Sequence, residues 1–186
     1  MDLGFRMHAE RTPNPNSVKW VLSQTLAEGG AGAHFPEPVS EAVSPLAARL
    51  FEVEGVIGVF VAGNFVTVTK SEEREWGDLA QGVVDALKAF VAAEDPAFGP
   101  DYQEPSASAE GDGVAARVRD ILENEVRPAV AQDGGDIIFA GYRDGVVEVY
   151  LQGSCAGCPS STLTLKMGIE QRLREEIPEI REVVAL

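Results

Sequence analysis

The sequence predicts two small α+β domains, each a small β-sheet packed with helices, joined by a flexible acidic linker. Strand-like and helix-like runs alternate in both halves, and 186 residues suit one large domain or two small ones. Residues 95–113 hold Pro, Gly, Ser, Ala and acidic residues but no Lys or Arg, so this stretch cannot bury enough apolar surface to order itself. The predicted domains therefore span residues 1–94 and 114–186.

The first half opens with a strand over 3–9 and a returning strand over 18–22. Between them, the prolines and asparagines of residues 12–16 predict a turn, because proline fixes φ and asparagine bonds to its own backbone. A loop is expected over 29–41.

Ser44 and Pro45 predict a helix start, with the serine as N-cap and the proline at the first helical position. The runs 56–61 and 65–70 flank Gly-Asn and predict a β-hairpin. Apolar residues recur at helical spacing over 76–92, which predicts an amphipathic helix.

The second half starts with a predicted helix over 114–130, which Pro128 should kink or tighten near its end. Two strands over 137–142 and 146–151 form a hairpin. A long helix over 159–176 and a last strand over 180–184 complete the domain.

The net charge of −15 excludes a basic footprint, so we expect no binding to nucleic acid or to anionic membrane surfaces. No apolar run approaches the ~18 residues of a membrane span. The first ten residues show neither a signal-peptide core nor an Arg- and Ser-rich transit segment. These features predict a cytoplasmic protein.

Cys155 and Cys158 are the only two cysteines of the chain and form one C-x-x-C loop between a strand and a helix. Such a pair can hold a metal, an iron–sulfur cluster or a redox disulfide. Two thiolates do not fill a four-thiolate site, so a metal here needs a second subunit or a borrowed ligand. The pair predicts an exposed site that is completed from outside the chain.

The surroundings of the loop favour thiolates. The helix starting at Pro159 turns its N-terminus towards the cysteines, which should lower their pKa values. Gly153 and Gly157 allow positive φ and keep side chains away from the metal. Spacing alone leaves an iron–sulfur site, a zinc site and a thiol oxidoreductase level with one another.

The other candidate residues are weaker. His8 and His34 are the only histidines, and we interpret them as surface or packing residues. The run Asp-Gly-Gly-Asp over 133–136 is interpreted as a tight turn. No nucleophile–base motif appears, so we expect a protein that is not an enzyme.

With these motifs in view, the chain resembles the Nfu/NifU family of iron–sulfur cluster scaffold and carrier proteins. The second half resembles the NifU C-terminal domain and the first half the Nfu N-terminal domain. The matching segments are residues 127–129, 133–136, 151–166, 168–170 and 175–179 in the second half, and 12–16, 44–47, 51–56, 58–60 and 65–70 in the first.

The resemblance implies a protein that binds a [4Fe-4S] cluster, or a [2Fe-2S] cluster, and transfers it to apo-proteins. Cys155 and Cys158 match the two cluster ligands of the family, and the cluster lies on the axis of a homodimer. The implied partners are apo client proteins and an upstream cluster donor. Asn14 and Asn16 match a signature of the N-terminal domain, which we interpret as a turn that organises a hairpin.

Overall fold

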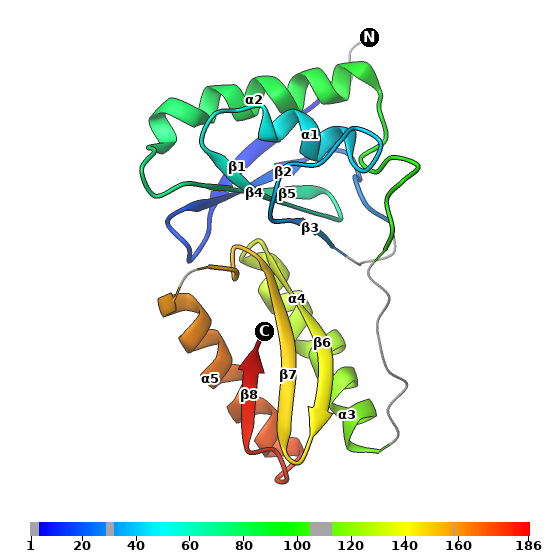
Figure 1. Cartoon of the computed structure of the whole chain (residues 1–186), viewed down its shortest axis with the longest axis vertical. Coiled ribbons are helices and arrows are strands. Elements are labelled where there is room, and N and C mark those ends of the chain that lie inside the picture. The colour runs from blue at the N-terminus through cyan, green and yellow to red at the C-terminus, as the bar shows by residue number, and fades with distance from the viewer. Residues whose placement is uncertain (1–3, 29–31, 105–112, 158) are drawn as a thin grey trace. The chain divides into compact units, whose positions relative to one another are not determined.

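A computed structural model describes residues 4–28, 32–104, 113–157 and 159–186. The chain divides into two compact units, Met1–Pro105 and Ser106–Leu186. Each unit has its own β-sheet and its own helices (Figure 1). Each also has its own hydrophobic core. The α+β class predicted from the sequence is confirmed.

The sheet of the first unit is antiparallel and has the order β1-β2-β5-β4-β3. Its strands are β1 (Met7–Arg11), β2 (Ser17–Leu22), β3 (Ala33–Phe35), β4 (Val56–Ala62) and β5 (Phe65–Lys70). The predicted hairpin over 56–70 is present as β4 and β5. By contrast, β3 lies inside the stretch predicted as loop, where too few alternating residues precede the next turn to signal a strand.

Helices α1 (Pro45–Phe51) and α2 (Trp76–Ala93) cover one face of this sheet (Figure 1). Ser44 caps α1 as predicted, since its side chain accepts a hydrogen bond from the Ala47 amide. The core between helices and sheet includes Leu46, Leu50, Val59, Val61, Val66, Val68, Leu79, Val83, Leu87 and Phe90.

The asparagines of residues 12–16 organise the turn between β1 and β2. Asn14 is buried, and its Oδ1 accepts from the Asn16 amide at 3.0 Å. Asn16 Oδ1 in turn accepts from Lys70 Nζ at 3.0 Å, which ties the turn to the end of β5. The structure thus gives both asparagines the turn-forming role predicted for them.

Residues 95–104 differ from the predicted linker and belong to the first unit. Ala97 is buried, Phe98 stacks on Tyr102 with ring centroids 4.3 Å apart, and the Ala97 carbonyl accepts from Ser44 Oγ at 2.7 Å. Composition missed this because three apolar side chains, spaced among prolines and acidic residues, suffice to anchor the segment. Residues 105–112 of the predicted linker lie outside the described residues.

The second unit holds a three-stranded sheet of β6 (Gly135–Arg143), β7 (Val146–Gly153) and β8 (Glu182–Ala185). β6 and β7 form an antiparallel hairpin, and β8 returns parallel to β7 after α5 (Pro159–Glu176). The core includes Val118, Leu122, Val130, Ile137, Val147, Ile169, Leu173, Ile177 and Val183.

The first helix of this unit is interrupted one turn before Pro128. It runs as α3 (Val114–Ile121), a π-helical turn η1 (Leu122–Val126) and α4 (Arg127–Gln132). The Arg127 amide donates to the Leu122 carbonyl, five residues back. Pro128 explains the widening, because its ring collides with the carbonyl four residues earlier and it lacks an amide donor. The predicted kink is therefore a π-turn.

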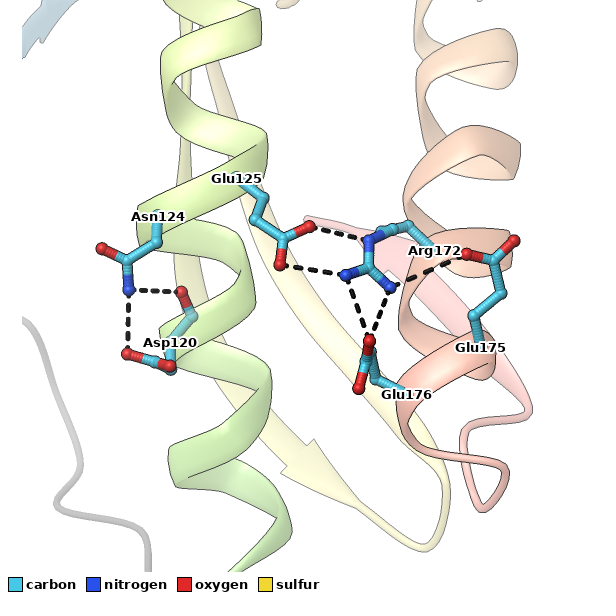
Figure 2. Close-up of polar contacts among 6 residues, drawn as sticks. All are labelled: Asp120, Asn124, Glu125, Arg172, Glu175 and Glu176. Carbon is cyan, nitrogen blue, oxygen red and sulfur yellow. Dashed lines mark hydrogen bonds and ion pairs between the residues drawn. The ribbon is translucent and has the colours of Figure 1, made fainter.

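Arg172 connects α5 to this widened turn (Figure 2). Its Nε and Nη2 atoms donate to the two carboxylate oxygens of Glu125, at 2.7 and 3.0 Å. Glu176 and Glu175 flank the same guanidinium from α5. Such a bidentate pair fixes the orientation of the two helices more than it contributes to stability, since its groups are partly exposed.

We predict that Ser44→Ala destabilises the first unit by about 2 kcal/mol, because it removes the helix cap and leaves the buried Ala97 carbonyl without a donor. Both tryptophans of the chain, Trp20 and Trp76, lie in this unit, so urea unfolding followed by tryptophan fluorescence reports on it. Exposed Ser40 is the matched control, and Ser40→Ala should leave the midpoint unchanged. Equal midpoints for the two variants would contradict the anchoring of residues 95–104.

Candidate functional site

The thiol of Cys155 packs directly on the backbone of Gly135. β7 ends at Gly153, and the chain then folds back so that Cys155 is only 8% exposed and joins the core of the second unit. A Cβ atom added to Gly135 would lie 2.5 Å from Cys155 Sγ and 3.0 Å from the Gln152 carbonyl oxygen. Only glycine leaves room for the sulfur at this position.

The loop around Cys155 is tied to the turn formed by residues 133–136. The Ser154 amide donates to the Gly134 carbonyl at 3.1 Å, and Ser154 Oγ donates to the Asp133 carbonyl at 2.5 Å. On the other side, Thr162 Oγ1 of α5 donates to the Cys155 carbonyl at 3.1 Å. Backbone and side-chain bonds therefore hold the cysteine between two elements distant in sequence.

An ion pair between Arg127 and Asp136 stabilises this turn. The guanidinium Nε and Nη2 atoms each lie 2.8 Å from one carboxylate oxygen of Asp136, which is 5% exposed. Asp136 Oδ1 also accepts from the Ile137 amide at 2.8 Å. The carboxylate raises the pKa of Arg127. A paired and hydrogen-bonded carboxylate can stay buried at the start of β6, so the turn keeps its shape.

Burial raises the pKa of the Cys155 thiol to about 11. The hydrogen bond between Ser154 Oγ and the Cys155 thiol opposes this rise in pKa, while the negative charges of Asp133 and Asp136 add to it. The sequence predicted the opposite, an exposed thiol with a lowered pKa beside a helix N-terminus. That prediction was wrong for Cys155, because its sulfur turns into the core and towards two carboxylates.

Cys158, the second predicted ligand, lies outside the described residues. Within the described ranges, no three His, Cys, Asp or Glu side chains gather around a point where a metal could bind. Both histidines are in the first unit, where His8 pairs with Glu10 and His34 is half-buried in β3, which lowers its pKa.

Sequence reasoning missed the role of Gly135. The Asp-Gly-Gly-Asp run was predicted to be only a turn, yet it forms the floor on which Cys155 rests. Gly134 has φ +77° and makes the turn, whereas Gly135 admits the sulfur. A tight turn needs only one glycine, so the second adjacent glycine was the sequence signal for a close contact at this position.

Among the described helices, none is both long and apolar enough to cross a membrane.

Residues 118–184 match the family model described as NifU-like domain, and residues 7–94 match the one described as Scaffold protein Nfu/NifU N terminal.

The chain is 40% identical over 179 residues to the human protein named NFU1 iron-sulfur cluster scaffold homolog, mitochondrial, covering 95% of this chain and 70% of that protein. It is 38% identical over 181 residues to the Drosophila virilis protein of the same name, covering 95% of this chain but 60% of that protein. The chain thus spans less than two thirds of the fly relative.

Both relatives are named as mitochondrial, which contradicts the cytoplasmic location predicted from the sequence. That prediction rested on the absence of a membrane-length apolar run and on the lack of signal-peptide or transit character in the first ten residues.

The solution structure of a NifU-like protein from Saccharomyces cerevisiae matches with a TM-score of 0.46 and 20% identity over 53% of this chain and 89% of that one. The two family matches and the human relative together show that this chain belongs to the Nfu/NifU family of scaffold proteins.

Proposed function

We propose that this chain binds an iron–sulfur cluster through Cys155 and Cys158 and transfers it to apo-proteins. The family supports the cargo, since the human relative is named an iron-sulfur cluster scaffold. The observation that carries the proposal is the mounting of Cys155, whose thiol rests on a glycine floor in a loop braced by two elements. The role is carriage of a cluster, and the chain itself is not an enzyme.

The ligand count favours a cluster shared between two copies of the chain. One chain supplies two cysteines, and a cubane cluster takes four thiolates. A homodimer with two cysteines from each subunit completes the set, with the cluster on the shared axis. We propose a [4Fe-4S] cluster, with a [2Fe-2S] cluster as a second form of the same cargo.

Loading requires a change at Cys155. Cluster iron binds thiolate, whereas the buried thiol is protonated at neutral pH. The sulfur must therefore leave the Gly135 floor and release its proton as iron binds. Gly153 (φ +65°) and Gly157 (φ +77°) flank the segment and provide the backbone freedom for this rotation. The apo loop then stores the thiol in a form protected from oxidation.

Release follows from the same arrangement. Thiolates of an apo client replace Cys155 and Cys158 one at a time, and each displaced cysteine takes up a proton. Cys155 regains its buried position on Gly135, which favours release because the protonated thiol is the stable form there. An upstream donor loads the cluster by the reverse exchange.

Anaerobic reconstitution with iron and sulfide, followed by metal, sulfide and mass analysis, tests the proposal. We expect about four irons and four sulfides per dimer, lost in Cys155→Ser. Ala156→Ser is the matched control in the same loop and should keep the cluster. Zinc bound without sulfide would support a zinc-bridged module instead. A metal-free monomer that cycles between dithiol and disulfide would support a thiol oxidoreductase.

Gly135→Ala should expel the thiol from its floor, because the new Cβ would overlap Cys155 Sγ. We expect faster alkylation of Cys155 in the apo protein and a loss of roughly 1–3 kcal/mol of stability in the second unit. Gly141→Ala is the control on the same strand, since its nearest neighbour is the flexible Glu148 carboxylate at 3.2 Å. Equal alkylation rates in the two variants would contradict the packing of Cys155 on Gly135.

The pH dependence of alkylation tests the storage of the protonated thiol. In a cluster-free Cys158→Ser chain, the rate at Cys155 should keep rising until about pH 11, because its pKa is raised to about 11. The folded thiol holds its proton where the unfolded thiol has lost it, so stability should fall as the pH rises from about 9 to 11. A rate that levels off near pH 9, as it should in urea, would contradict a buried thiol.

A further inference from the structure

β1 forms one edge of the first sheet, and the backbone groups that point outward can be assigned. The Ser23 amide donates to the Arg6 carbonyl, so residues 6, 8 and 10 bond inward to β2. The Leu22 amide donates to the Asn64 carbonyl on the other side of β2, so even-numbered residues of β2 bond to β5 and odd-numbered ones to β1. The amides and carbonyls of Met7, Ala9 and Arg11 therefore face away from the sheet, and no described residue bonds to them.

The same three residues place their side chains on the helix-covered face of the sheet. Met7 pairs with Leu22 and Ala9 with Trp20, and both partners are buried in the core below α2. Successive strand residues alternate between faces, so the core face continues outward to the open edge.

Two separate hollows lie along this edge of the sheet. One hollow of about 880 Å³ is lined by residues 5–9 of the edge, by Trp20, and by Val84 and Lys88 of α2. A second hollow of about 520 Å³ lies at the other end, where the turn between β1 and β2 forms most of its lining and Arg11, Val18 and Trp76 form the rest. Trp76 begins α2, so the helix runs antiparallel to β1 beside the hollows.

The stretch of α2 beside the hollows and the edge of the sheet opposite it have similar lengths. From Trp76 to Lys88 the helix rises roughly 18 Å at ~1.5 Å per residue. From Phe5 to Arg11 the edge extends roughly 20 Å at ~3.3 Å per residue. One further strand would fill this space and direct every second side chain into the hollows.

Two kinds of polar group at the hollows lack a partner among the described residues. Trp20 is 6% exposed, and its Nε1 is buried with no acceptor within the part of the chain that the structure describes. No ion pair of Arg11 or Lys88 occurs there either, whereas His8 and Lys19 share Glu10 on the opposite face of the sheet. This rim is basic on a chain whose net charge is −15. An acceptor-bearing, acidic ligand suits both features.

We propose that β1 and α2 form a docking groove for an extended peptide segment of a protein partner, with alternating apolar and acidic residues. The peptide adds as a strand outside β1, and its backbone bonds to Met7, Ala9 and Arg11. Its apolar side chains enter the two hollows, and its carboxylates meet the basic rim. Strand addition of this kind derives affinity from the backbone and specificity from pockets for alternate side chains.

The Ala9→Pro variant tests peptide binding at this edge without disturbing the fold of the first unit. The Ala9 amide points outward, so Ala9→Pro removes an edge donor without removing a bond to β2. Ala9→Val is the matched control, because valine keeps the donor and suits a strand. Tryptophan fluorescence should show equal unfolding midpoints for both variants.

The probe is a phage-displayed library of random peptides, selected against the full chain. We expect enriched sequences that alternate apolar and acidic residues and that shift the fluorescence of Trp20 and Trp76. Ala9→Pro should weaken the selected peptide about tenfold or more, and Lys88→Glu should weaken it with a smaller salt dependence.

Three outcomes would overturn the proposal. Selection without enriched peptides, or peptides that bind the Ala9→Pro chain equally well, would exclude strand addition at β1. Enriched basic peptides would contradict the charge argument. A dimer of the apo chain that Ala9→Pro dissociates would assign the edge to a second copy of this chain instead. Cluster binding involves the other unit and should be unchanged in every variant.

Discussion

The contact between the Cys155 thiol and the Gly135 backbone is the constraint around which the second unit is built. It requires a residue without a Cβ at the start of β6, and it requires the loop after β7 to fold back onto the turn. The Ser154 hydroxyl and the Arg127–Asp136 ion pair hold the two sides in register. A cysteine placed this way is buried and holds its proton, so the proposed binding of iron by this thiol requires the sulfur to move.

Pro128 contributes to the same construction at a distance. The proline forces the π-turn before α4, and this turn sets the rotation of the short helix that carries Arg127. From the other side, Arg172 joins the π-turn to α5, the helix that follows the C-x-x-C loop. The helix interrupted by the π-turn therefore contacts both the turn over residues 133–136, through Arg127, and α5, through Glu125. Widened helical turns often occur near functional sites, and here the cause is a single residue.

The two units divide the chemistry of the protein. The second unit carries the only cysteines, whereas the first has an open sheet edge, both tryptophans and a basic rim on an acidic chain. The proposed carrier function needs a place for the cluster and a way to hold protein partners, and these needs favour different surfaces. A reactive thiol benefits from protection, while a docking groove depends on exposed backbone donors and acceptors.

The sequence by itself determined the α+β class, most strand and helix positions, the Ser44 cap and the cysteine pair, because these depend on local periodicity and short motifs. Tertiary structure decided the rest. Residues 95–104 are ordered by Ser44 and by the core, contacts that composition does not encode. The burial and raised pKa of Cys155 depend on a turn roughly twenty residues earlier, and local spacing cannot report which groups a folded chain brings to a sulfur atom.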